Sequence, residues 1–82
     1  MNKEQIRAVW LDELVKVAPD LDPAGISGSD HLQDDLELDS MDVLNFVTAL
    51  HAALGVDIPE RDYPMIATTD LAVAYLAKTI PG

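Results

Sequence analysis

The stretch from Asp34 to Gly55, DDLELDSMDVLNFVTALHAALG, joins an acidic segment to a strongly amphipathic one. Its apolar side chains recur at steps of four, three and four residues, which is the spacing of one face of an α-helix. They are Val43, Val47, Leu50 and Leu54, and Leu44 and Phe46 broaden the face. Gly55 suits a C-terminal cap, and Asp39 or Ser40 can accept hydrogen bonds from the first-turn N–H groups. This stretch therefore predicts a helix over residues 41–54, with Ser40 at its start.

A second amphipathic stretch lies at the beginning of the chain. Asn2 and Gln5 have the spacing of a capping box, and Pro19 disfavours continuation of a helix beyond Ala18. The apolar positions between them are Ile6, Val9, Trp10, Leu14 and Val17. Because these positions follow the helical period, they predict a first helix with one buried stripe.

The last amphipathic stretch begins after Thr68 or Thr69 and is ended by Pro81-Gly82. Its apolar positions are Leu71, Val73, Tyr75, Leu76 and Ile80. Residues 60–67 predict one irregular helical turn, with Pro64 limiting its length. We therefore expect an all-α fold, a single domain over residues 1–82 built as a bundle of three main helices plus one short irregular helix.

A long connection, residues 19–39, separates the first two main helices. Apolar residues recur through it, which predicts that it docks on the core rather than staying a free linker. These residues are Leu21, Ile26, Leu32, Leu36 and Leu38. Within the connection, residues 31–36 could form a short helical turn.

The bulk composition restricts the possible functions. The 82 residues carry 15 Asp and Glu against 5 Lys and Arg, a formal charge of −10, which disfavours nucleic-acid binding and favours basic protein partners. No cysteine is present, so any thiol chemistry requires an added group. The sequence contains neither an apolar signal core nor a run of membrane-spanning length. We expect a cytoplasmic monomer that binds neither nucleic acid nor membrane.

Residues 34–42 place five carboxylates around the single hydroxyl of Ser40. A solvated acidic surface is the simplest interpretation. An EF-hand calcium loop is excluded, because Ser40 would occupy its glycine position and Phe46 its bidentate glutamate position. We therefore predict no metal site.

Catalysis by Ser40 itself is not indicated. The G-x-S-x-G elbow is missing, and His51 would lie roughly 16 Å away along the same helix. His31 could approach from the loop, but no oxyanion-hole motif accompanies it. We therefore predict no catalytic residue and expect a protein that is not an enzyme.

The residues around Ser40 resemble the signature of the acyl carrier protein family. Residues 36–42, Leu-Glu-Leu-Asp-Ser-Met-Asp, are similar to its leucine-led Asp-Ser-Leu-Asp type motif at the start of the second helix. Residues 49–59 resemble the end of the family's second helix with its Ile-Pro entry to the third, and residues 68–76 resemble its fourth helix. The resemblance covers nearly the whole chain, and Asp39-Ser40 is its most specific element.

The resemblance implies a carrier whose chemistry is supplied by an attached group. In the family, a phosphopantetheinyl transferase uses Mg²⁺ and coenzyme A to attach 4′-phosphopantetheine to the serine, which here is Ser40. The arm ends in a thiol that carries acyl groups as thioesters. The implied partners are this transferase and acyltransferase, ligase or synthase enzymes with basic docking surfaces.

The resemblance also assigns roles to neighbouring residues. Partner recognition would fall to Asp35, Glu37, Asp39, Met41 and Asp42. A bound acyl chain would be partly enclosed by Leu44, Phe46, Val47, Ile58, Ile66 and Tyr75, although ordinary core packing would account for each of these residues equally well.

Three departures from the family pattern affect these expectations. Glu37 stands where the family often has glycine, and because glutamate resists a positive φ, the loop geometry is expected to differ. Tyr63-Pro64 interrupts the third helix, which is expected to be shortened or to begin at Pro64. The later part of the second helix is uncharged where fatty-acid carriers are acidic; its residues are Asn45, Thr48, His51, Ala52 and Ala53.

Together the departures favour a specialised carrier, for polyketide or other secondary metabolism or a dedicated acyl modification, over the housekeeping fatty-acid protein. Two alternatives stay open at this point. One is a peptidyl carrier protein, although Asp39 before the serine favours the acyl class. The other is an acidic helical interaction module that is never modified, in which Ser40 only caps its helix.

Overall fold

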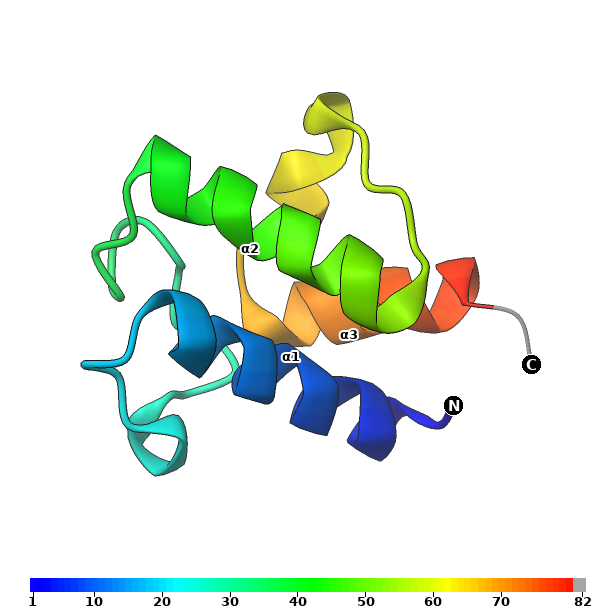
Figure 1. Ribbon diagram of the computed structural model, residues 1–82. Helices are drawn as coiled ribbons and strands as arrows, with labels where there is room; N and C mark the ends of the chain where they lie inside the picture. Colours follow the sequence, from blue (N-terminus) through cyan, green and yellow to red (C-terminus); the bar gives the residue numbers. More distant parts are fainter. Residues whose placement is uncertain (81–82) are drawn as a thin grey trace.

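The computed structural model describes residues 1–80, and within them the regular structure is entirely helical (Figure 1). Its elements are α1 (Lys3–Val17), the 3₁₀ helix η1 (Pro23–Gly25), α2 (Ser40–Leu54), the 3₁₀ helix η2 (Glu60–Ile66) and α3 (Thr69–Thr79). This confirms the all-α prediction of three main helices and one short irregular helix. None of the helices in this range is both long and apolar enough to cross a membrane.

The helix ends follow the capping signals of the sequence. Asn2 and Gln5 form the predicted capping box, with the Gln5 N–H donating to Asn2 Oδ1 at 2.8 Å and the Asn2 N–H donating to Gln5 Oε1 at 3.0 Å. Gly55 ends α2 with a φ of 68°, which glycine adopts without steric cost. Thr68 caps α3 by accepting the Leu71 N–H. The predicted stop at Pro81-Gly82 lies outside the described residues.

The three main helices share one hydrophobic core. In Figure 1, α1 runs antiparallel to α2 and α3, and it packs against both. Trp10 and Phe46 meet edge to face with their ring centroids 4.5 Å apart, and the Trp10 indole N–H donates to Thr69 Oγ1 at 3.0 Å. All three side chains are buried. One aromatic residue of α1 therefore links α2 and α3.

The long connection is ordered by contacts with the core and with the start of α3. Leu32 and Leu38 are buried, and Leu21, Ile26 and Leu36 pack against the core, as predicted. Residues 31–36 form successive turns rather than a helix, because the N–H groups of Asp35 and Leu36 both donate to the His31 carbonyl. The short helix η1 was not predicted from the sequence.

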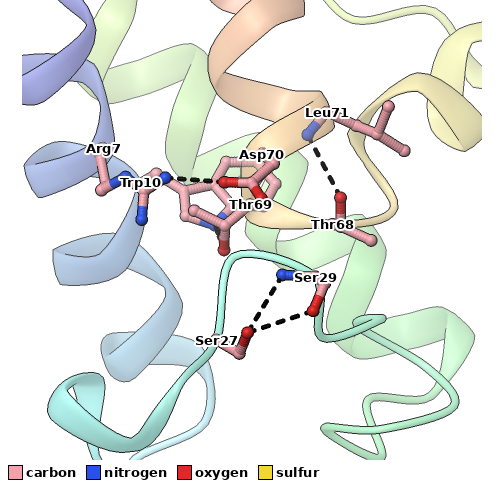
Figure 2. Close-up of polar contacts among 8 residues, drawn as sticks. All are labelled: Arg7, Trp10, Ser27, Ser29, Thr68, Thr69, Asp70 and Leu71. Carbon is pink, nitrogen blue, oxygen red and sulfur yellow. Dashed lines mark hydrogen bonds and ion pairs between the residues drawn. The ribbon is translucent and has the colours of Figure 1, made fainter.

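Backbone hydrogen bonds fasten this connection to residues far along the chain. The Leu32 N–H donates to the Ala67 carbonyl at 2.9 Å, and the Asp70 N–H donates to the Gly28 carbonyl at 3.0 Å. Figure 2 shows the loop at Ser27 and Ser29 beside the first turn of α3. These bonds hold the connection that leads to Ser40 against the start of α3.

The segment η2 lies within residues 60–67, the range predicted to hold one short irregular helical turn. It begins at Glu60, directly after the extended residue Pro59, and Pro64 lies inside it. The expectation that this helix begins at Pro64 is therefore wrong. Pro64 removes one N–H donor from the segment, and the segment ends two residues later at Ile66, in line with the expectation that this proline limits its length.

Candidate functional site

Ser40 is the first residue of α2, and Asp39 is the residue that caps the helix. The Asp42 N–H donates to Asp39 Oδ1 at 2.8 Å, and the Asp39 N–H donates to Asp42 Oδ2 at 3.3 Å. The carboxylates flanking Ser40 thus form a capping box. The interpretation in which Ser40 serves as the cap is wrong, because Asp39 already fills that role.

The Ser40 hydroxyl is exposed and accessible. Within residues 1–80 it takes part in no hydrogen bond. Both histidine rings are engaged elsewhere: His51 Nδ1 lies 2.9 Å from the Val56 carbonyl, and His31 Nδ1 accepts the backbone N–H groups of Gln33 and Asp34. The arrangement therefore presents an ordinary alcohol to solvent and provides no base to activate it.

The start of α2 also suits a negatively charged substituent on this hydroxyl. The first N–H groups of a helix have no intrahelical partner, and the helix macrodipole adds partial positive charge there. The capping box uses the N–H of Asp42. The preceding first-turn N–H groups, those of Ser40 and Met41, remain available to phosphate oxygens attached at Ser40.

Glu37 adopts a left-handed backbone conformation with a φ of 61°, and among residues 1–80 it is the only non-glycine residue with a positive φ. The expectation that glutamate would avoid this conformation is wrong. Hydrogen bonds on both sides explain it, because the Leu36 N–H donates to the His31 carbonyl and the Leu38 N–H donates to the Leu32 carbonyl. Burial of Leu38 adds to the energy that offsets the local strain.

Three of the other residues assigned to partner recognition, Asp35, Glu37 and Met41, are exposed. Asp35 is exposed, and its Oδ2 accepts the His31 N–H at 2.7 Å. Glu37 is exposed, and Met41 is 63% exposed. Among residues 1–80, no three His, Asp or Glu side chains are grouped to hold a metal ion.

A cleft of about 670 Å³ opens beside Ser40. Among the described residues, no Cα of η2 lies within 8 Å of a Cα of α2, so the two elements stand apart and side chains line the space between them. The turn at residues 31–33 completes the wall. The lining residues are His31, Leu32, Gln33, Ser40, Met41, Val43, Leu44, Glu60, Tyr63, Pro64, Ile66 and Ala67.

The cleft contains only part of the predicted acyl-chain lining. Leu44, which is 48% exposed, and Ile66 line it, whereas the predicted residues Phe46, Val47 and Ile58 are buried in the core. Sequence reasoning missed Val43, His31, Tyr63 and Pro64 as lining residues.

Tyr75 lies outside this lining and interacts with η2 instead. Its hydroxyl donates to Asp62 Oδ2 at 2.8 Å. This hydrogen bond, with a smaller contribution from burial, raises the pKa of Tyr75 above its usual value of 10.0. Tyr75 therefore fastens η2 to α3.

Comparison with known proteins supports the resemblance to the acyl carrier protein family along most of the chain. The family described as "Phosphopantetheine attachment site" matches residues 4–76. A solved solution structure assigned to the acyl carrier proteins, from Anaplasma phagocytophilum, superposes with a TM-score of 0.83 at 25% identity and covers 95% of this chain and 91% of that one.

Three curated relatives are also named as acyl carrier proteins. Acyl carrier protein 2, mitochondrial, of Arabidopsis thaliana is 32% identical over 83 residues, covering 90% of this chain and 66% of that protein. The mitochondrial protein of Neurospora crassa is 36% identical over 55 residues, 67% of this chain and 41% of its own length. The protein of Rubrobacter xylanophilus is 27% identical over 81 residues, 95% of both chains.

The relatives correct one expectation. Two of these three proteins are named as mitochondrial, which contradicts the cytoplasmic assignment made from the sequence. The present chain spans only 66% and 41% of their lengths. Composition and the lack of an apolar signal core were insufficient grounds for assigning a compartment.

Proposed function

This chain belongs to the phosphopantetheine attachment-site family that includes the acyl carrier proteins, and from this premise we propose that Ser40 receives the 4′-phosphopantetheine arm. Members of this family bear the arm covalently and act as carriers rather than as catalysts. The observation that carries the assignment of Ser40 is its exposed hydroxyl at the first position of α2, which no other residue in the described range engages.

The surroundings of Ser40 fit the group. Attachment joins Ser40 Oγ to the phosphorus of coenzyme A that bears the pantetheine, and the pyrophosphate bond from that phosphorus to the departing adenosine 3′,5′-bisphosphate breaks. The serine proton passes to a base on the transferase. The first-turn N–H groups of α2 then lie next to the new phosphodiester, and the cleft beside Ser40 gives the arm a surface on which to rest. The arm supplies the thiol that this cysteine-free chain lacks.

The acidic surface around Ser40 would steer basic partners to it. The formal charge of −10 raises the encounter rate with a positively charged enzyme surface, and added salt weakens that attraction. Glu37 and Met41 are exposed beside Ser40 without a capping role. We assign them to contact with the transferase and with the enzymes that load or use the acyl group.

The cargo that we propose is an acyl group held as a thioester, because Asp39 precedes the serine as in the acyl class. The exposed face of α2 carries Asn45, Thr48, Ala52 and Ala53, which bear no charge. Partner enzymes of housekeeping fatty-acid synthesis would meet less charge here than on typical fatty-acid carriers. A specialised pathway, such as polyketide synthesis or a dedicated acyl modification, is therefore our proposal.

Incubation with coenzyme A, Mg²⁺ and a promiscuous phosphopantetheinyl transferase, followed by intact mass, tests the attachment. We expect the gain of one phosphopantetheinyl group in the wild type and in Ser29→Ala, a matched change of another exposed serine, but not in Ser40→Ala. The Ser40→Ala protein should match wild-type stability within about 0.5 kcal/mol, because no hydrogen bond is lost. An unchanged mass of folded wild-type protein would refute the carrier assignment.

Electrostatic steering has its own test. Glu37→Lys should slow modification more than Asp57→Lys, which makes the same charge change at an exposed site just after the far end of α2. Added salt should slow the wild-type reaction and reduce the difference between the two variants. Equal rates for the two variants at low salt would show that total charge, rather than the surface at Ser40, governs docking.

A further inference from the structure

All of the sulfur in this chain is in methionine side chains, because the sequence contains three methionines and no cysteine. The side chains of Met1, Met41 and Met65 are 46%, 63% and 52% exposed. None of the three belongs to the hydrophobic core. A thioether that faces solvent can be reached by a dissolved oxidant, and the product of its oxidation is methionine sulfoxide.

Met41 differs from the other two methionines in its place beside the attachment residue. It is the most exposed large apolar side chain in the described range, and it follows Ser40 directly in the first turn of α2. It also lines the cleft next to Ser40. Figure 1 shows the N-terminus, which bears Met1, at the opposite end of the bundle from the start of α2. Met41 is therefore the thioether that shares a surface with the hydroxyl.

An enzyme that acts on Ser40 also contacts Met41. Consecutive Cα atoms are about 3.8 Å apart, whereas a stable protein–protein contact covers about 800 Å² of each partner. A transferase that brings a phosphorus atom to Ser40 Oγ therefore removes the neighbouring thioether from water. Burial of this flexible apolar side chain stabilises the contact. The same burial is unfavourable for a polar group that finds no hydrogen-bond partner.

The fold itself does not depend on the Met41 thioether. The side chain is absent from the hydrophobic core, and the capping box that begins α2 is made by Asp39 and Asp42. A polar sulfoxide at residue 41 would stay in solvent in the free protein. Its cost therefore arises when a partner removes it from water.

We propose that Met41 is a reversible oxidation site whose sulfoxide slows docking at Ser40 without unfolding the protein. This inference rests on the proposed attachment at Ser40. The oxidant is a hydroperoxide: the sulfur attacks one peroxide oxygen, the O–O bond breaks and an S–O bond forms. The sulfur is oxidised and the peroxide is reduced; with hydrogen peroxide, the second oxygen leaves as water after taking the proton of the first. Methionine sulfoxide reductases reverse the change with electrons from thiols.

The test uses the full chain before the arm is attached, because the thiol of the arm also reacts with peroxide. The protein is treated with hydrogen peroxide, the peroxide is removed, and peptide mass spectrometry measures the sulfoxide at each methionine. Attachment with coenzyme A, Mg²⁺ and the transferase is then followed by intact mass. We expect oxidation of Met41 to lower kcat/KM for attachment by roughly tenfold, the effect of one unpaired polar group in a contact. The circular dichroism spectrum should stay helical, and the two reductases that act on the two sulfoxide epimers should restore the rate.

Matched variants assign the effect to one sulfur. Met41→Leu keeps an apolar side chain that peroxide does not oxidise, so its rate should be the same before and after treatment. Met65→Leu retains Met41 and should lose rate on treatment as the wild type does. Met41→Gln places a polar amide at this position and should be slow without any peroxide.

The outcomes separate this inference from the attachment itself. Failure of the untreated protein to gain mass at Ser40 would overturn the proposed function. An unchanged rate for protein whose Met41 is fully oxidised, or an equal loss of rate in treated Met41→Leu, would overturn the role of Met41 alone. Loss of the helical spectrum together with the rate would show that oxidation acts by unfolding, which would also overturn it.

Discussion

Replacement of Glu37 by glycine should stabilise the protein, because Glu37 holds a φ of 61°. A left-handed conformation costs a side-chain-bearing residue roughly 1–2 kcal/mol. Glycine avoids that cost, but it loses more conformational freedom on folding, which lowers the stability by about 0.5–1 kcal/mol. The net gain expected for Glu37→Gly is therefore about 0.5–1 kcal/mol. For a domain of this size, that raises Tm by roughly 2–8 °C.

Urea unfolding followed by circular dichroism should show a higher midpoint at an unchanged m-value. Glu37 also lies among other carboxylates, so loss of its charge could stabilise the fold without any backbone effect. Glu37→Gln removes the charge and retains the left-handed strain, and its stability change should fall towards zero at high salt. If Glu37→Gly were no more stable than Glu37→Gln at high salt, the argument from backbone strain would be refuted.

Three further perturbations test the contacts that support the site. Asp39→Ala should cost about 1 kcal/mol of unfolding free energy, because it removes the cap of α2, and urea unfolding measures it. Thr69→Val should cost roughly 1–3 kcal/mol by leaving the buried Trp10 N–H unpaired, whereas Thr69→Ser should cost less; equal losses would contradict this. The fold favours the protonated phenol of Tyr75. Its raised pKa therefore contributes stability that is complete below pH 10.0 and is lost as the pH rises through the folded pKa. Unfolding midpoints measured from pH 10.0 upwards should fall less steeply for Tyr75→Phe. Asp62→Asn should lower the pKa of Tyr75 in a phenolate absorbance titration.

The helices could be predicted because their signals are local. The Asn2 and Gln5 capping box, the apolar steps of α2 and the glycine after Leu54 each depend on residues within one or two turns of each other. The same local reasoning found Asp39 and Ser40 at the helix start. It could not decide between them, because either side chain can serve as a cap.

The parts that could not be predicted depend on contacts between distant segments. Glu37 adopts a positive φ because hydrogen bonds from Leu36 and Leu38 to the turn at residues 31–32 fix the backbone around it. No pattern in the sequence predicts those bonds. The cleft depends on the separation of α2 from η2. Only that separation reveals that Tyr63 lines the cleft whereas Phe46 fills the core.

The backbone bonds between the connection and the start of α3 affect when the attachment site can form. Backbone hydrogen bonds link Gly28 to Asp70 and Leu32 to Ala67. The segment leading to Ser40 therefore lacks these stabilising bonds until α3 has been synthesised and has docked. Contacts between such distant residues form late, because chain closure must precede them. Synthesis proceeds from the N-terminus. A transferase that recognises the folded connection before Ser40 would therefore modify the chain only after the whole bundle has formed.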